Sequence, residues 1–253
     1  MRQNPTLFIQ SPSDRNMFVL FMVILLSSIS VNLVTPIWIF YVSSLGASIV
    51  ELGYISGIPS AVTAFVNILG GSLSDKYGRR KLNVIGTLFG VFPPLLYIFA
   101  KNWVELIPWV ILSGLATGLS LPVRWSIVAD SSTDRKRAMT FGWMNIAFLL
   151  GSTFAPFVGG FTADALGIRS TFVLCSVFMS SCLIFSLLLK ESRKPPTHQP
   201  VIDSNRGETR QFLTLVFIIL ALNVIQATGI GIYIPITPKF IERQFKATYT
   251  DAG

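Results

Sequence analysis

The residue types that most often carry catalysis or bind metals are rare in this chain. It has one histidine and two cysteines in 253 residues. His198 lies in a charged, proline-containing stretch, where a solvated side chain is the simplest interpretation. Cys175 and Cys182 stand seven apart in a charge-free run, so they share a helical face and are expected to pack there. With no metal-site spacing, no nucleophile–histidine pair and no paired membrane-embedded acids, the sequence predicts no enzyme, metal or cofactor.

Charge is instead concentrated in short segments. The stretch GGSLSDKYGRRK, residues 70–81, holds one acid and four cations between two long charge-free runs. Gly71 and Gly78 permit close approach and unusual backbone angles. Asp75 can face a helix N-terminus, where the helix dipole favours an anion. The chemistry available to this hinge is ion pairing and turn formation rather than bond making.

The runs between these charges determine the class of protein. Charged residues make up 13% of the chain, against about 25% in an average soluble domain. They are absent from residues 16–50, 52–74, 82–100, 106–123, 138–163, 170–189 and 211–238. A helix that crosses the hydrocarbon core needs roughly 20 apolar residues, and period-2 alternation typical of a membrane β-barrel is missing. The sequence predicts an all-α integral membrane protein with helices at 17–41, 50–72, 82–100, 104–129, 138–162, 168–189 and 211–238.

The net charge of +8 reports topology in this interpretation. Alternate segments collect fourteen cations, which are Arg2, Arg15, Lys76, Arg79, Arg80, Lys81, Arg135, Lys136, Arg137, Lys190, Arg193, Lys194, Arg206 and Arg210. The intervening loops before the seventh helix carry only Lys101 and Arg169. Short cytoplasmic loops are rich in Lys and Arg, so the N-terminus is predicted to be cytoplasmic. A nucleic-acid partner is not expected, and the predicted surroundings are a lipid bilayer, the plasma membrane.

The chain divides into three predicted parts. Residues 1–189 form a six-helix transmembrane bundle, residues 190–210 a charged, flexible cytoplasmic linker, and residues 211–253 the first helix of a second bundle. A faint repeat supports two halves, because TPIWIFYVSSLGASIVELG at 35–53 matches TPKFIERQFKATYTDAG at 237–253. The chain stops where an eighth helix is expected, which predicts a fragment or a truncated gene product.

The hinge GSLSDKYGRRK resembles the signature between the second and third helices of the major facilitator superfamily, and it falls at that position. The residues that carry the resemblance are Gly71, Leu73, Asp75, Lys76, Gly78, Arg79 and Arg80. In that family the hinge acts as a conformational latch. The resemblance implies that Asp75 meets a helix of the opposite half and that Arg79 pairs with Asp130.

A second stretch, GWMNIAFLLGSTFAPFVGG at 142–160, resembles the antiporter motif of drug–proton exchangers in the same superfamily. Its matching positions are Gly142, Gly151, Ala155, Pro156 and Gly159, with Ala155 in place of a glycine. Small residues on one face let helices approach closely, and Pro156 bends the segment. Generic close packing is the alternative interpretation.

The resemblance also implies a substrate cavity between the two halves. Its candidate lining residues are Asn32, Trp38, Tyr41, Asn67, Arg124, Asn145, Asn223 and Gln226. Drug exporters of this family carry an arginine where this chain has Val110. Arg124 lies further along, six residues before Asp130, where it either faces protein or a watery cavity, or extends to the cytoplasmic interface.

These features predict a major facilitator-type half-bundle with a seventh transmembrane helix. The expected function is secondary transport of a small organic solute by alternating access, with drug/proton antiport as its specific form and protons as the coupling ion. A missing C-terminal half, or a second half-bundle, is the expected partner. The alternative is a non-transporting remnant or a receptor-like seven-helix membrane protein.

Overall fold

The computed structural model describes residues 12–132 and 136–191, together with five positions between residues 214 and 225. The described ranges contain helices and no strand, which confirms the predicted all-α class. The helices are α1 (Pro12–Val34), α2 (Trp38–Ser44), α3 (Ile49–Tyr77), α4 (Arg79–Tyr97), a 3-10 helix (Trp103–Leu106), α5 (Ile107–Ser131), α6 (Arg137–Leu166) and α7 (Ile168–Leu188).

The seventh predicted helix is described only at isolated positions. Thr214, Phe217, Ile218, Leu222 and Ile225 are helical. Most of the range 211–238 and the stretch 192–210 lie outside the described residues, and so do the cavity candidates Asn223 and Gln226.

Five described segments are long and apolar enough to cross a membrane. They are Arg15–Val34, Ile49–Ile68, Trp103–Ser131, Arg137–Leu166 and Ile168–Leu188. The 19-residue α4 is not among them, and its first turn consists of Arg79, Arg80 and Lys81. The apolar part of α4 nevertheless packs inside the same bundle, between α5 and α7.

Most helix boundaries lie within five residues of the sequence prediction, and two differences change how the helices connect. The helix expected at 17–41 breaks at Thr35–Ile37, so α1 and α2 are separate helices. Pro36 has no N–H to donate, and turns of the type Ile37 N–H to Val34 C=O (3.2 Å) replace helical bonds there. The second predicted helix, 50–72, runs on to Tyr77, so most of the expected turn is helical.

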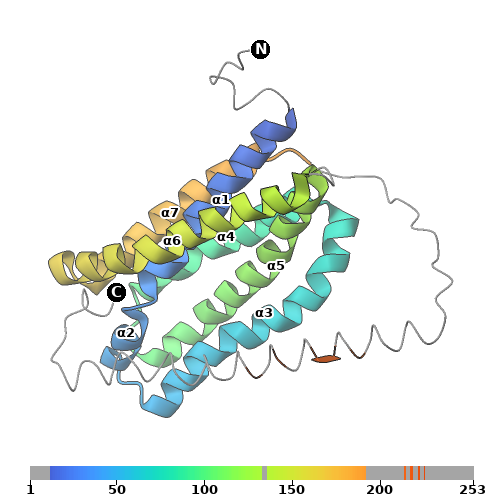
Figure 1. Ribbon diagram of the computed structural model, residues 1–253. Coiled ribbons are helices and arrows are strands. Elements are labelled where there is room, and N and C mark those ends of the chain that lie inside the picture. The colour runs from blue at the N-terminus through green and yellow to red at the C-terminus, as the bar shows by residue number, and fades with distance from the viewer. Residues whose placement is uncertain are drawn as a thin grey trace. The chain divides into compact units, whose positions relative to one another are not determined.

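The helices of residues 12–191 form a single antiparallel bundle (Figure 1). α1 packs against α6 and α7, while α4 packs against α5 and α7. α3 packs mainly on α5 and lies at the edge of the bundle. The face of α3 that points away from α5 exposes large apolar side chains such as Phe65 and Ile68.

The core consists of two separate hydrophobic clusters, one toward each end of the bundle. The first gathers residues such as Leu20 of α1, Leu82 of α4 and Ile127 of α5, near the α3–α4 turn. The second gathers Val42 of α2 and Phe172 of α7 with their neighbours, at the opposite end. We call these ends the hinge end and the far end.

Local capping fixes where the helices begin. At the far end Ser48 and Glu51 form a capping box on α3, in which the Ser48 N–H donates to the Glu51 carboxylate at 2.6 Å. At the hinge end a single residue, Gly78, joins α3 to α4. Its φ of +97° is a left-handed value that favours glycine, which explains the residue at this tight turn.

Candidate functional site

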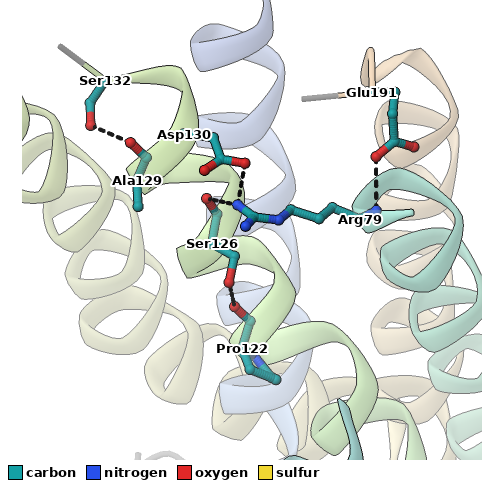
Figure 2. Close-up of polar contacts among 7 residues, drawn as sticks. All are labelled: Arg79, Pro122, Ser126, Ala129, Asp130, Ser132 and Glu191. Atoms are coloured by element: carbon teal, nitrogen blue, oxygen red, sulfur yellow. Dashed lines mark hydrogen bonds and ion pairs between the residues drawn. The ribbon is translucent and has the colours of Figure 1, made fainter. Parts of the chain in front are cut away.

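An ion pair joins α4 to α5 at the hinge end. The Arg79 guanidinium pairs with the Asp130 carboxylate and also donates to the Ser126 carbonyl oxygen at 2.7 Å (Figure 2). Both charged side chains are partly buried, with 22% and 15% of their surface exposed. Arg79 opens α4 and Asp130 closes α5, so the pair links the start of one helix to the end of its neighbour.

Four other hinge residues precede Arg79 in the chain and belong to α3. Gly71, Leu73, Asp75 and Lys76 belong to the last turns of α3. Leu73 packs against the hydrophobic cluster of the hinge end, and Lys76 is exposed. The Asp75 side chain lies outside the described part of the structure, so its expected contact with the opposite half stays a prediction.

A second acid, Glu191, contacts the hinge from the short segment that follows α7. The Glu191 carboxylate accepts a hydrogen bond from the backbone N–H of Arg79 at 2.8 Å (Figure 2). Arg80 in turn donates to the Leu187 carbonyl oxygen at 2.7 Å, near the end of α7. Three helices are therefore connected at the hinge end. Arg79 and Asp130 join α4 to α5, and Arg80 and Glu191 join α4 to the end of α7 and the segment after it.

The antiporter-like motif forms a seam between α6 and α1. Gly151, Ala155 and Gly159 are buried at intervals of four residues, which places them on one helical face. A Cβ on Gly151 would lie 2.6 Å from the Ser28 Cβ, and one on Gly159 would overlap the Leu33 carbonyl oxygen. The Ser28 hydroxyl donates across the same seam to the Phe148 carbonyl oxygen at 2.7 Å.

The remaining positions of that motif have other surroundings. Gly142 is exposed, and no atom comes within 4 Å of where its Cβ would be. Pro156 is half-buried inside α6. The close packing therefore depends on the small residues at 151, 155 and 159 rather than on the whole motif.

Arg124 is buried inside the bundle, where its guanidinium faces neighbouring helices. Only 8% of its surface is exposed. Its guanidinium donates to Asn83 Oδ1 at 3.0 Å, to the Ser27 hydroxyl at 2.7 Å and to the Thr87 hydroxyl at 3.3 Å. These partners belong to α1 and α4. Among the described residues Arg124 contacts protein, and its place in a cavity completed by a second half stays a prediction. Four helices meet around Arg124, since Cys182 of α7 lies 3.9 Å away.

A groove of about 420 Å³ runs between α3 and α5. Its lining residues are Pro59, Ser60, Thr63, Ala64, Asn67, Ser113, Gly114 and Thr117. None of the eight is charged, and five carry a hydroxyl or an amide. The Thr63 hydroxyl is satisfied by the Gly114 carbonyl oxygen at 3.1 Å, whereas Asn67 is exposed.

The other cavity candidates do not converge on this groove. Tyr41 is buried, its hydroxyl bonds the Tyr97 carbonyl oxygen, and its ring packs edge-on against Phe172. Asn32 donates to the Ser28 carbonyl oxygen within α1 at 2.8 Å. Trp38 is half-buried beside Tyr97, and Asn145 is exposed on α6. Of the described candidates, only Asn67 lines the groove.

The chain has counterparts among known proteins. A family model described as "Major Facilitator Superfamily" matches residues 20–253. The chain belongs to the major facilitator superfamily. It is therefore a multi-pass integral membrane protein of a transporter family, and its relatives are transporters rather than enzymes.

Two curated relatives of this superfamily protein are matched over most of its length. An uncharacterized MFS-type transporter of Methanocaldococcus jannaschii is 28% identical over 230 residues, which are 87% of this chain and 59% of the relative. Multidrug resistance protein 1 of Bacillus subtilis is 25% identical over 237 residues, 93% of this chain and 59% of the relative. The chain thus spans about 59% of the length of these two transporters.

A solved structure supports the major facilitator fold independently of sequence. A bacterial homologue of the human lysosomal transporter Spinster, in an inward-facing and unoccupied conformation, superposes with a TM-score of 0.76. The likeness covers 96% of this chain and 58% of that one at 16% sequence identity, so it concerns the fold alone.

Sequence reasoning missed several residues of this superfamily member. Residues 190–210 are predicted to form a linker, so Glu191 is not among the predicted site residues. No local signal identifies Glu191, because the helix that it contacts begins 112 residues earlier in the chain. Asn83, Ser27 and Thr87 gave a weak signal, because polar residues in apolar helices most often bond within their own helix. A buried arginine requires several such acceptors, which is the signal that connects them to Arg124.

Proposed function

We propose that this chain supplies the six-helix half of a secondary active transporter, which moves a small organic solute across a membrane by alternating access. The groove between α3 and α5 carries this proposal. α3 exposes large apolar side chains such as Tyr54, Phe65 and Ile68, whereas its side of the groove adds hydroxyl and amide groups. Polar groups inside a membrane bundle face protein or a watery path rather than lipid.

The solute that suits the groove is an amphiphilic organic molecule without a required charge. All eight lining side chains are uncharged, so the groove offers hydrogen bonds and apolar contact but no ion-pair partner. The names of two relatives, Multidrug resistance protein 1 and Quinolone resistance protein NorA of Staphylococcus aureus, support a drug-like solute. The antiporter-like motif at 142–160 supports exchange against protons.

The orientation belongs to the same proposal. The cations of the hinge end, together with those before α1 and after α7, put that end and the N-terminus in the cytoplasm. The membrane would be the plasma membrane, and the remaining helices of a complete cavity would come from a second half.

Transport by membrane vesicles tests this function. Inverted vesicles that contain the protein are energised to an acidic interior, and accumulation of norfloxacin is compared with that in vesicles without it. We expect gradient-dependent accumulation that nigericin abolishes. The matched variants are Arg79→Gln, which should slow accumulation, and Lys81→Gln, which should not, because Lys81 is exposed in the same turn. Equal accumulation with and without the protein would contradict the proposal.

A further inference from the structure

The N-terminus of α4 has no cap of its own. Gly78 occupies the N-cap position and has no side chain to accept from the first N–H groups of the helix. The first N–H groups of any helix lack partners within it and favour a nearby anion. The first turn of α4 carries three cations, Arg79, Arg80 and Lys81. These positive charges add to the positive end of the helix dipole, so a nearby carboxylate stabilises this terminus further.

Glu191 supplies that acid from 112 residues further along the chain. Its Oε1 accepts from the Arg79 N–H at 2.8 Å. Its Oε2 lies where a side chain at Gly78 would be, 2.9 Å from the position of a Cβ. The absence of a side chain at Gly78 is therefore what gives the carboxylate access to the helix N-terminus, in addition to the positive φ of the turn.

Arg79 is consequently held on two sides (Figure 2). Its backbone N–H is bound by Glu191, and its guanidinium by Asp130 and the Ser126 carbonyl oxygen. A shift of the α4 N-terminus would move the guanidinium relative to the end of α5. The backbone contact thus determines where the side chain starts its reach toward Asp130.

The segment that carries Glu191 is fixed to the bundle by two further contacts. Arg80 donates to the Leu187 carbonyl oxygen at 2.7 Å. The Lys190 N–H donates to Asn16 Oδ1 of α1 at 3.0 Å. The stretch 192–210 follows in the sequence and lies outside the described residues. Glu191 is therefore the last described residue of the segment after α7, and it contacts the hinge.

We propose that Glu191 is a positioning residue that caps α4 in trans, holds Arg79 in register for Asp130, and so couples the segment that follows α7 to the hinge ion pair. A displacement of residues 189–191 acts first on the Glu191 carboxylate, then on the first turn of α4, and then on the Arg79–Asp130 pair. The proposal concerns contacts inside the bundle and does not depend on the identity of any solute.

Hydrogen exchange of the full chain in lipid nanodiscs, measured by mass spectrometry, tests this coupling. In Glu191→Ala we expect amides 79–82 of α4 to exchange about two- to fivefold faster, the range that corresponds to loss of an anion at a helix N-terminus. Amides 127–132 of α5 should also exchange faster, although Glu191 does not touch them. Glu191→Gln keeps an acceptor oxygen and removes the charge, so it should give a smaller change at the same amides.

Two controls separate positioning from a purely local cap. Lys190→Ala alters the neighbouring exposed side chain, retains the Lys190 N–H, and should leave both regions unchanged. In an Asp130→Asn background, Glu191→Ala should still accelerate amides 79–82 but no longer affect amides 127–132. Unchanged exchange at 79–82 would overturn the cap. A change confined to 79–82 in the otherwise native protein would overturn the positioning role. Glu191→Gln decides both points if the alanine variant does not fold.

Discussion

Gly151 and Gly159 are the residues at which α6 comes closest to α1. A methyl group at Gly159 would overlap the Leu33 carbonyl oxygen, which belongs to backbone and cannot rotate away. Gly142 belongs to the same motif and the same helix, but it faces open space. Residues of one type in one motif therefore have different structural requirements, and substitution distinguishes them.

Replacement of Gly159 by alanine is expected to destabilise the bundle by about 1–3 kcal/mol, the usual cost of overpacking. Gly142→Ala should be neutral or stabilise by up to about 1 kcal/mol, because alanine is the better helix former and meets no neighbour. Melting temperatures of the two variants in detergent check this. Equal melting temperatures would show that the α1–α6 seam is looser than described.

The buried contacts of Arg124 predict which of two substitutions at this position destabilises the bundle more. A lysine there keeps the buried charge but cannot reach Asn83, Ser27 and Thr87 at once, since its ammonium lacks the planar fork of arginine. Methionine removes the charge, and the Thr87 hydroxyl still has the Asn83 carbonyl oxygen as an acceptor. We therefore expect Arg124→Lys to be less stable than Arg124→Met by about 1–3 kcal/mol.

Thermal unfolding followed by size-exclusion chromatography measures the difference. Arg169→Lys serves as the control for the same chemical change at an exposed arginine, and it should leave the melting temperature unaltered. A lysine variant that melts at or above the methionine variant would show that the guanidinium fork is not what accommodates the charge.

At the scale of elements, the bundle end is organised by contacts between helix termini. α4 begins where α5 and α7 end, and charged groups satisfy all three. The Arg79–Asp130 pair is partly buried, so it is expected to contribute more than an exposed pair, whose usual value is below about 1 kcal/mol.

A double-mutant cycle with Arg79→Gln and Asp130→Asn measures that contribution. We expect a coupling free energy of at least about 1 kcal/mol between the two sites, which is above the usual value for an exposed pair. The parallel cycle with Arg80→Gln should be additive within about 0.5 kcal/mol, because Arg80 binds α7 rather than Asp130. Additivity in both cycles would contradict an ion pair that matters for stability.

The helices could be predicted from the sequence more readily than their contacts. Charge-free runs located every described long helix, since a membrane-spanning backbone has few other options. The break at Thr35–Ile37 was signalled only by Pro36 and was not predicted. The direction of Arg124 and the reach of Glu191 to Arg79 depend on which helices become neighbours. Local sequence does not encode that choice, and so neither contact could be predicted.

At the scale of the whole molecule, the bundle has two chemically different ends. The hinge end carries Lys81, Lys136 and Lys190, whereas Lys101 lies at the far end, between α4 and the 3-10 helix. An antiparallel bundle in a bilayer must place these ends on opposite sides of the membrane.

Labelling of introduced cysteines by a membrane-impermeant maleimide tests the orientation. Lys101→Cys should react in intact cells, and Lys81→Cys only after the membrane is opened. The native thiols, Cys175 and Cys182, are both buried and free, so the background should be low. Reaction of Lys81→Cys in intact cells would invert the proposed topology.

The two hydrophobic clusters leave a middle layer between them with a different composition. There the helices meet through Gly90, Gly114, Ala116 and Gly151 rather than through large interlocking side chains. Small residues slide past one another with less steric resistance than branched ones. Bending of the bundle would therefore be concentrated in this middle layer, while the packing of the two end clusters is preserved.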